Sequence, residues 1–413
     1  MRPNGLLLFL AVMVSVSKLR ADDWPQWRGP NRDGVWRTAE LPDRLPADGL
    51  SPRWKQPIGG GYGGIAVASR RVYVLDRQTK PREVERVVCL DAANGKQLWI
   101  HENAVNYQKM DYGNGPRSTP TVYDGRVYTF GALGHLHCLD AATGKLIWDR
   151  DTVRDFKGRV PTWGHACSPL VDGDRLVVQV GGEDACVVAF DRATGKALWK
   201  VLPDRPGYSS PVLVDTKVGR LLIYWTAEHL NGLDPTTGKV RWQVPHTTEY
   251  DVTISDPVYV DGVLFVGDYW TGSFAVQLDE RGDNPKRIWE RKRVSLLMST
   301  PLTRAGHAYA LDKDKGLTCI ELMTGKVKWD AEFVTPRGRN PQASLVWVGE
   351  RALIFNELGE LILARLSPGG FQEISKTPIL QDGTWANPAF ADNCIFARND
   401  KEIVCVPLTA KTR

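Results

Sequence analysis

Apolar residues along the chain occur in short runs that end at turns rich in glycine, asparagine and aspartate. Runs such as "RVYVL" and "RLVVQV" have the length of β-strands, and few stretches repeat apolar residues at helical spacing. The content of 39 glycines and 26 prolines fits many tight turns. The pattern therefore predicts an all-β protein built from short antiparallel strands.

One turn recurs as an eleven-residue motif, which reads "CLDAATGKLIW" at 138–148. Its aspartate can accept backbone N–H groups two residues on, its glycine supplies a positive φ, and its tryptophan fills space between neighbouring sheets. Five near-complete copies, two degraded copies and one truncated copy share this order of residues. They lie at 89–99, 138–148, 189–199, 232–242 and 319–329, then 277–289 and 364–374, and finally 405–411.

A second signal alternates with this motif. It is mostly a Ser, Thr, Asn or Asp followed by proline, which opens a strand, a short turn and another strand. Six clear copies and two weaker ones begin at 118, 167, 209, 255, 299 and 387, and at 62 and 340. One four-stranded unit thus repeats about every 40 to 50 residues, as in a β-propeller blade. Eight openings predict an eight-bladed β-propeller of four-stranded antiparallel blades.

The two ends of the repeat array fit each other. The last unit has three strands and no fourth, whereas an unassigned strand, "SPRWKQPI" at 51–58, precedes the first unit. We expect this N-terminal strand to close the last blade, because closure removes an exposed sheet edge. Residues 51–413 are therefore expected to form one propeller, with residues 22–50 packed on it.

The stretch "DWPQWRGPNRDGVW" at 23–36 holds three tryptophans around a run of turn residues. It lies just before the strand that closes the ring. We expect it to cover the seam between the first and last blades or one end of the ring, and a binding arm is the alternative.

Residues 1–21 have the features of a secretory signal peptide. A basic residue, Arg2, precedes the apolar run 6–16, and Ala21 supplies a small residue for cleavage. The run is too short to span a bilayer comfortably. We therefore expect a secreted or periplasmic protein that is not an integral membrane protein.

Charge excludes one class of partner. The formal net charge is +5, and removal of residues 1–21 takes away three basic residues, which leaves about +2. A nearly neutral chain does not favour nucleic-acid binding.

The seven cysteines do not form an obvious disulfide framework. Cys89, Cys138, Cys319 and Cys405 occupy the same small-residue position of the motif in different blades, too far apart to bridge. We expect these four cysteines to be buried residues with free thiols. A bridge between Cys394 and Cys405 across one hairpin stays open.

Candidate binding residues lie in the loops that lead from the outer strand of one blade to the inner strand of the next. Aromatic rings with arginines around a central funnel could cradle a flat anionic ligand, or they could simply plug the channel mouth. The candidates are Tyr62, Arg117, Trp163, His165, Tyr208, Glu249, Asp251, Arg337 and Trp385.

No catalytic or metal-binding set is predicted. His165 and Ser168 lack a third member of a nucleophilic triad. Glu249, Asp251 and Asp256 come from one loop without EF-hand spacing.

The eleven-residue motif resembles the tryptophan-docking motif of pyrroloquinoline-quinone-type eight-bladed propellers. In that family each tryptophan stacks on a peptide plane of a neighbouring blade. The resemblance assigns this role to Trp99, Trp148, Trp199, Trp242 and Trp329, and in less regular copies to Trp289 and Trp54.

The family includes quinoprotein alcohol dehydrogenases, the scaffold propeller of the outer-membrane barrel-assembly machinery, and secreted members of unknown role. The start "WPQWRGPNRDGV" at 24–35 resembles the last group. The resemblance thus implies a monomeric, non-catalytic scaffold or ligand-binding module that acts on another cell-envelope protein or a small ligand.

Two alternatives remain. The first is a quinoprotein dehydrogenase with pyrroloquinoline quinone and Ca²⁺ in the funnel. The sequence departs from that class because it lacks adjacent cysteines, long insertions and a haem-attachment motif. These departures favour a protein that is not an enzyme, without deciding the question. The second alternative is a polysaccharide-binding module that uses the aromatic face.

Overall fold

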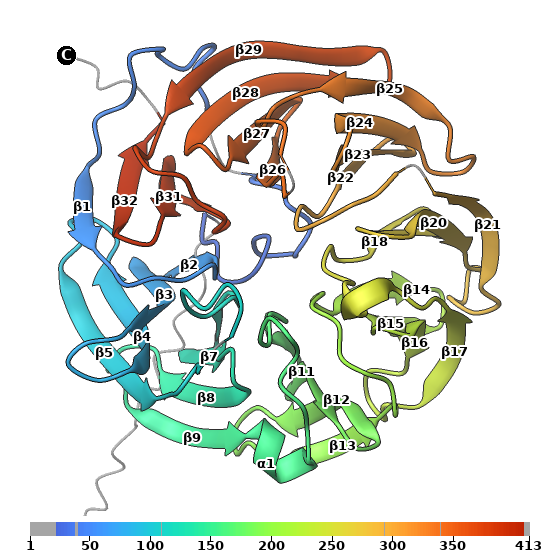
Figure 1. The fold of residues 1–413 in the computed structure, drawn as a ribbon, viewed down its shortest axis with the longest axis horizontal. Coiled ribbons are helices and arrows are strands. Elements are labelled where there is room, and N and C mark those ends of the chain that lie inside the picture. The colour runs from blue at the N-terminus through green and yellow to red at the C-terminus, as the bar shows by residue number, and fades with distance from the viewer. Residues whose placement is uncertain (1–21, 38–39, 109, 293, 339, 409–413) are drawn as a thin grey trace, which may run out of the picture.

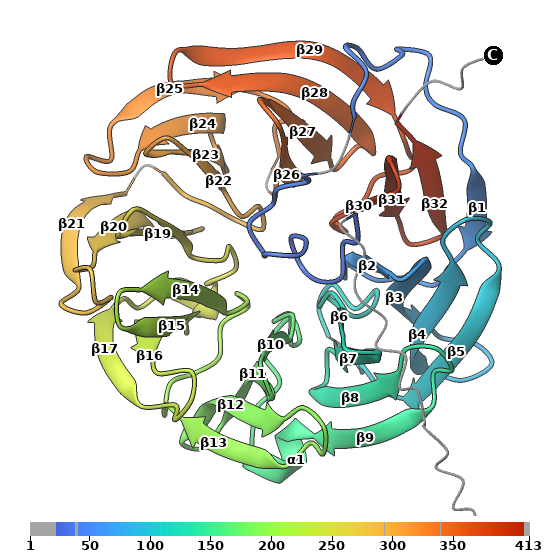
Figure 2. The same ribbon diagram turned by 180° about the vertical axis from the view of Figure 1, so that it is seen from behind.

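The computed structural model describes residues 22–37, 40–108, 110–292, 294–338 and 340–408. The predicted signal peptide lies outside the described residues. Eight four-stranded antiparallel sheets stand around a central axis like the blades of a propeller (Figures 1 and 2). The predicted fold class is therefore confirmed. In the described ranges helix is limited to α1 (Thr152–Phe156) and a 3₁₀ turn, η1 (Glu249–Asp251).

Each blade runs from an inner strand at the axis to an outer strand at the perimeter. Blade 1 holds β2 (Ile65–Ala68), β3 (Arg71–Gln78), β4 (Val84–Asp91) and β5 (Gln97–Ala104). Blade 2 holds β6 (Thr121–Tyr123), β7 (Arg126–Phe130), β8 (His135–Asp140) and β9 (Leu146–Asp151). Blade 3 holds β10 (Leu170–Asp172), β11 (Arg175–Gly182), β12 (Ala185–Asp191) and β13 (Ala197–Val201). Blade 4 holds β14 (Val212–Thr216), β15 (Gly219–Trp225), β16 (His229–Leu233) and β17 (Val240–Pro245).

The second half of the ring follows the same order. Blade 5 holds β18 (Val258–Val260), β19 (Val263–Asp268), β20 (Gly272–Gln277) and β21 (Lys286–Arg291). Blade 6 holds β22 (Leu302–Arg304), β23 (His307–Asp312), β24 (Gly316–Glu321) and β25 (Val327–Glu332). Blade 7 holds β26 (Ala343–Val348), β27 (Arg351–Asn356), β28 (Glu360–Ser367) and β29 (Gly370–Pro378). Blade 8 holds β30 (Ala389–Ala391), β31 (Cys394–Arg398), β32 (Glu402–Pro407) and β1 (Trp54–Pro57).

Blade 8 joins the two ends of the chain, as the sequence predicts. β1 pairs antiparallel with β32, and Trp54 lies opposite Cys405 in the register. The N-terminal strand therefore occupies the outer position of the last blade, which is the position of the missing fourth strand.

No disulfide bond takes part in this closure. All seven are free thiols with buried side chains. Cys394 and Cys405 lie on the neighbouring strands β31 and β32, but they are not directly opposite each other, because Cys405 pairs with Phe396.

Seven tryptophans join seven of the eight blades to the next one, and blade 7 has Ile374 at the end of its motif copy instead. Each indole Nε1–H donates a hydrogen bond of 2.6 to 3.3 Å to a backbone carbonyl in or next to the motif turn of the following blade. The donors are Trp54, Trp99, Trp148, Trp199, Trp242, Trp289 and Trp329. Trp54 bonds to Ala92 of blade 1, so the seam between blades 8 and 1 has the same contact as the six junctions from blade 1 to blade 7.

The motif glycine is required where the indole packs on the turn. Gly144 has a φ of +72°, and a Cβ there would lie 2.5 Å from the ring of Trp99. Both the backbone conformation and the close approach exclude a larger residue.

The side chain of the residue before each strand-opening proline in blades 3 to 6 connects that blade to the preceding one near the axis. Ser168 Oγ accepts the Thr119 N–H at 2.9 Å, and Ser210 Oγ accepts the Ser168 N–H at 3.0 Å. Asp256 Oδ1 then accepts the Ser210 N–H at 2.6 Å, and Thr300 Oγ1 accepts the Asp256 N–H at 3.1 Å. Each side chain thus caps the equivalent backbone group of the preceding blade, from blade 2 to blade 6.

Residues 22–37, here called the axial arm, cross the middle of the ring (Figure 2). The arm pairs with inner strands through its backbone. Trp24 and Val67 of β2 exchange two N–H···O bonds of 2.8 Å, and the Val122 N–H of β6 donates to Pro25. Farther along, Trp36 N–H donates to Trp347 of β26, whose own N–H donates to Gly34.

Side chains of the axial arm contact further blades. Arg28 Nη2 donates to the Pro301 carbonyl of blade 6 at 3.1 Å, and Arg32 Nη1 donates to the Pro169 carbonyl of blade 3 at 3.0 Å. The rings of Trp24 and Trp36 pack on Phe390 of blade 8, with centroids 5.4 and 5.2 Å away. The arm therefore covers the seam between blades 1 and 8 and also fills one end of the channel.

Substitutions of Trp148 test how much the contact between blades contributes to the free energy of unfolding. Trp148→Ala should lower the free energy of unfolding by roughly 3–5 kcal/mol, because it removes a buried indole. Trp148→Phe should cost less, since most of the apolar contact stays and the hydrogen bond to Arg192 is lost. Denaturant unfolding measures both. Trp270→Ala is the matched control at an indole that is 40% exposed, and equal losses at the two positions would contradict this account.

Candidate functional site

The channel mouth opposite the axial arm holds a cavity of about 220 Å³. Its walls come mostly from the loops that join one blade to the next, and aromatic rings dominate them. The aromatic lining residues are Trp27, Tyr62, Tyr112, Trp163, Tyr208, Tyr269, Trp270 and Trp385. Trp27 belongs to the axial arm, so the arm closes this cavity from below.

The rings form separate groups around the cavity. Trp385 lies between Tyr62 and Tyr112, with centroid distances of 5.7 and 5.6 Å. Trp163 packs on Tyr208 at 5.6 Å. These contacts are tilted, with interplanar angles of 35°, 36° and 43°. All five rings line the cavity, so they can contact a ligand there.

The third group lies in blade 5. Tyr269 and Trp270 form the turn between β19 and β20, with centroids 4.5 Å apart, and Tyr250 of η1 packs on Trp270 at 5.7 Å. Tyr250 is 67% exposed, which places this group at the rim.

Arg117 is the cation in the wall of the cavity. Its guanidinium lies over the ring of Tyr62, 5.4 Å from the centroid. Its terminal nitrogens donate to the backbone carbonyls of Gly115, Asp111 and Tyr112. Burial lowers the pKa of Arg117 from its ordinary value. The side chain thus holds the 110–117 loop in place through these carbonyls.

Asp256 is the carboxylate of the cavity, and it is 5% exposed. Trp27 Nε1–H and the Ser210 N–H donate to its two oxygens. Burial raises the pKa of Asp256, while these donors and the nearby Arg28 and Arg32 act in the opposite direction. The residue joins the axial arm to blades 4 and 5.

Five of the nine candidate binding residues line this cavity. They are Tyr62, Arg117, Trp163, Tyr208 and Trp385.

The other four lie elsewhere. His165 is 2% exposed and packs on Phe130 at 4.8 Å, and Glu249 is exposed in η1. Asp251 pairs with Arg205 at 2.8 Å, and Arg337 lies over Phe333 at 4.1 Å. Burial of His165 and the side-chain contacts of Asp251 and Arg337 are not visible in the sequence.

Several lining residues were not among the sequence candidates. Tyr269 and Trp270 lie in a hairpin between the middle strands of a blade, and such turns face the same side as the blade-to-blade loops. A search of these turns would have found the "DYWTG" stretch at 268–272. Gln342 and Asn387 also line the cavity, and Trp27 does so because the axial arm reaches the axis.

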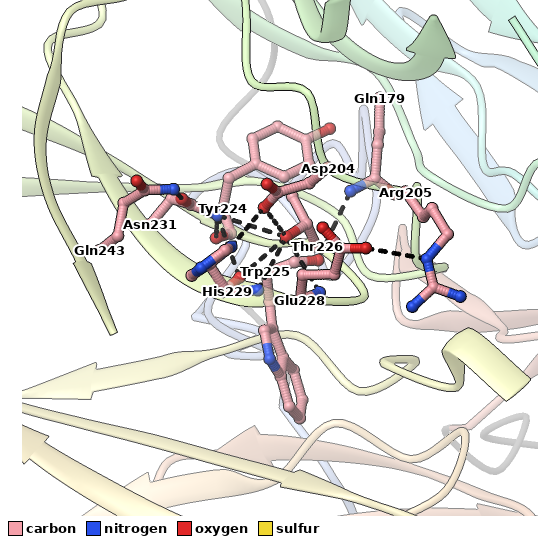
Figure 3. Close-up of polar contacts among 10 residues, drawn as sticks. All are labelled: Gln179, Asp204, Arg205, Tyr224, Trp225, Thr226, Glu228, His229, Asn231 and Gln243. Carbon is pink, nitrogen blue, oxygen red and sulfur yellow. Dashed lines mark hydrogen bonds and ion pairs between the residues drawn. The ribbon is translucent and has the colours of Figure 1, made fainter. Parts of the chain in front are cut away.

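A polar cluster joins the loop between blades 3 and 4 to the turn between β15 and β16 (Figure 3). One potential ligand atom each from Asp204, Glu228 and His229 lies within 4.8 Å of the others. His229 Nδ1 is 3.0 Å from Asp204 Oδ2, and Thr226 Oγ1 donates to the same oxygen. Arg205 Nε donates to Glu228 at 2.9 Å. These groups bond to one another, and the guanidinium of Arg205 already supplies a positive charge. That the protein has no metal site stays a prediction.

Pyrroloquinoline quinone does not fit the cavity residues. The quinone carries several carboxylates and, in this class, shares its site with Ca²⁺, which needs several oxygen ligands. Arg117 already donates to three carbonyls, and both oxygens of Asp256 are occupied. The chemistry of this donor set supports neither the quinone nor the cation.

The fold and the motif contacts define a propeller of the pyrroloquinoline-quinone type. A family model described as outer membrane protein assembly factor BamB matches residues 83–331 and 226–413. These matches cover more than half of the chain, which therefore belongs to this family.

Curated relatives give the same result at low identity. An outer membrane protein assembly factor BamB of Shewanella oneidensis is 24% identical over 231 residues, covering 52% of this chain and 57% of that protein. Another, of Alteromonas naphthalenivorans, is 26% identical over 312 residues, covering 72% and 63%. The chain thus spans about half of the length of the relatives it matches.

Solved structures share the fold. Quinohemoprotein alcohol dehydrogenase from Comamonas testosteroni superposes with a TM-score of 0.65 at 15% identity, covering 95% of this chain and 81% of that chain. BamB from Moraxella catarrhalis gives a TM-score of 0.60 at 17% identity, covering 86% and 99%. At this identity the likeness shows the fold alone. In the part of the chain that the structure describes, no helix is long and apolar enough to cross a bilayer.

Two buried histidines predict a pH dependence of stability. Burial lowers the pKa of both His165 and His137 from 6.5 to about 3. Between these values the unfolded chain binds more protons than the folded chain, so stability falls as the pH drops through this window. Each histidine contributes up to about 1.4 kcal/mol per pH unit.

His165→Gln should therefore reduce the loss of melting temperature between about pH 7 and about pH 5. His307→Gln is the control, because that imidazole is only half-buried. An unchanged pH slope in the His165 variant would contradict the proposed cause.

Proposed function

We propose that this protein is a non-catalytic propeller that acts as a protein-interaction scaffold in the cell envelope. The family match over residues 83–413 carries the proposal, because the family model is described as an outer membrane protein assembly factor. Export through the leader at residues 1–21 belongs to the same proposal.

The perimeter of the ring offers a surface for a partner. The outer strands β5, β9 and β13 belong to the adjacent blades 1, 2 and 3. The residue before the docking tryptophan on each of them is apolar and exposed: Leu98 by 42%, Ile147 by 42% and Leu198 by 49%. The same position holds a charged residue in two other blades, Arg241 in blade 4 and Lys328 in blade 6.

This apolar band has two properties that suit protein binding. Burial of exposed apolar side chains by a partner lowers the free energy of the complex, because it removes apolar surface from water. The strands that carry them are also the outer edges of their sheets, which leaves backbone groups able to pair with an added strand. Because the band lies at the perimeter, a partner bound there leaves the funnel open.

Site-specific photo-cross-linking in cells tests this proposal. With a photoreactive residue at position 147, we expect a discrete envelope protein to be cross-linked. The double variant Leu98→Glu, Leu198→Glu should reduce the yield about tenfold, because charges at the band oppose its burial.

Leu358→Glu is the matched control on blade 7, at a leucine that is 49% exposed. Equal cross-linking in both variants would contradict a partner at the band. Catalytic turnover by the purified protein would contradict the non-catalytic role.

A further inference from the structure

We propose that the funnel cavity binds a neutral saccharide through its aromatic walls. This site is separate from the perimeter band, and the proposal does not depend on the scaffold role. It rests on the ring faces, on an unpaired buried amide oxygen and on the state of the two charged groups in the wall.

The ring faces come from different parts of the ring of blades. Trp385 precedes blade 8, Trp163 precedes blade 3, and Trp270 lies within blade 5. An aromatic face carries partial negative charge, and the C–H groups on the face of a pyranose carry partial positive charge, so the two stack favourably. Aromatic faces on several sides suit a flat ring with C–H groups on both faces.

The volume of the cavity is large enough for one sugar ring. At about 220 Å³ it exceeds the volume of roughly 150 Å³ that admits benzene in an apolar protein cavity. The rim beyond it carries Tyr112 and Tyr250, which are 46% and 67% exposed and can contact the next sugar of a chain.

Gln342 gives a second, independent indication. It lines the cavity and is 4% exposed, and its Nε2 donates to the Trp385 carbonyl at 3.4 Å. Its Oε1 is buried and has no hydrogen-bond partner among the described residues. A buried amide oxygen without a donor costs free energy, and a sugar hydroxyl that reached this oxygen from the cavity would supply the missing donor.

The charged groups argue against a charged ligand. The guanidinium of Arg117 repels a cation and is already bonded to three carbonyls, so it is not free for a carboxylate. Asp256 has both oxygens bonded at the base of the cavity. The remaining polar lining consists of hydroxyl and amide groups, which recognise hydroxyls. They include Ser168, Ser210, Asn340, Gln342 and Asn387, besides the phenol groups of the lining tyrosines.

An extended peptide fits this site less well than a sugar. Peptide recognition by strand addition needs unpaired backbone at a sheet edge. Near the cavity the axial arm and the residues before proline already pair these groups, as at Val122, Ser168 and Ser210.

Tryptophan fluorescence titrations with cellotetraose, chitotetraose and a hexathreonine peptide, which has the backbone N–H groups that strand addition needs, test the proposal. We expect saturable binding of at least one of the two saccharides. Trp385→Ala should weaken it at least tenfold. Gln342→Met, which keeps the length of the side chain and removes the amide oxygen, should weaken it several-fold and keeps the test valid if Trp385→Ala does not fold.

Tyr123→Ala is the control, at an exposed tyrosine on β6 outside the cavity, and it should bind as the unaltered protein does. Three results would each overturn the proposal. They are no saturation by either saccharide at millimolar concentration, unchanged affinity in Gln342→Met, and binding of the hexathreonine peptide in place of the saccharides.

Discussion

The inner edges of the blades impose the main physical constraint on this structure. Each inner strand is the edge of a sheet, and its outward N–H and C=O groups face the axis of the ring. Unpaired backbone groups in such a place are costly. The chain pairs many of them in two ways, through the side chain before the strand-opening proline of blades 3 to 6 and through the axial arm. Val67 and Trp347 pair with the arm in both directions.

The axial arm also decides what the channel can do. Residues 22–37 cross the ring at one end, and Trp27 of this arm lines the cavity. Trp27 and Asp256 meet at its base, where the indole of the arm donates to the carboxylate of blade 5. The cavity above is aromatic and nearly free of available charge, which separates it from a quinone site. The same hydrogen bonds that stabilise the ring therefore define the pocket.

Sequence periodicity predicted the fold almost completely, because each blade repeats its turn residues and its tryptophan at nearly constant spacing. The missing fourth strand of the last unit was enough to place β1 beside β32. The site was predicted only in part. Arg117 and Trp385 could be assigned to the funnel from their loops, but the side chain of His165 turns into the core against Phe130. Such orientation depends on packing that no single stretch of sequence encodes.

Two surfaces of the molecule thus have different chemistry. The perimeter of blades 1 to 3 offers aliphatic side chains on free strand edges, whereas the funnel offers ring faces and neutral polar groups. They lie at opposite ends of the blades, so a partner and a saccharide can be bound together. Both surfaces depend on the ring keeping its shape at the axis.

Hydrogen exchange at the inner strands tests most directly whether the axial arm completes the ring. The amides of Val67, Val122 and Trp347 donate to carbonyls of the arm, whereas the Gly144 amide donates to Asp140 within its own motif turn. Deletion of residues 22–37 should strongly accelerate exchange at the first three amides and leave Gly144 protected. Equal protection of Val67, Val122 and Trp347 with and without the arm would contradict the account.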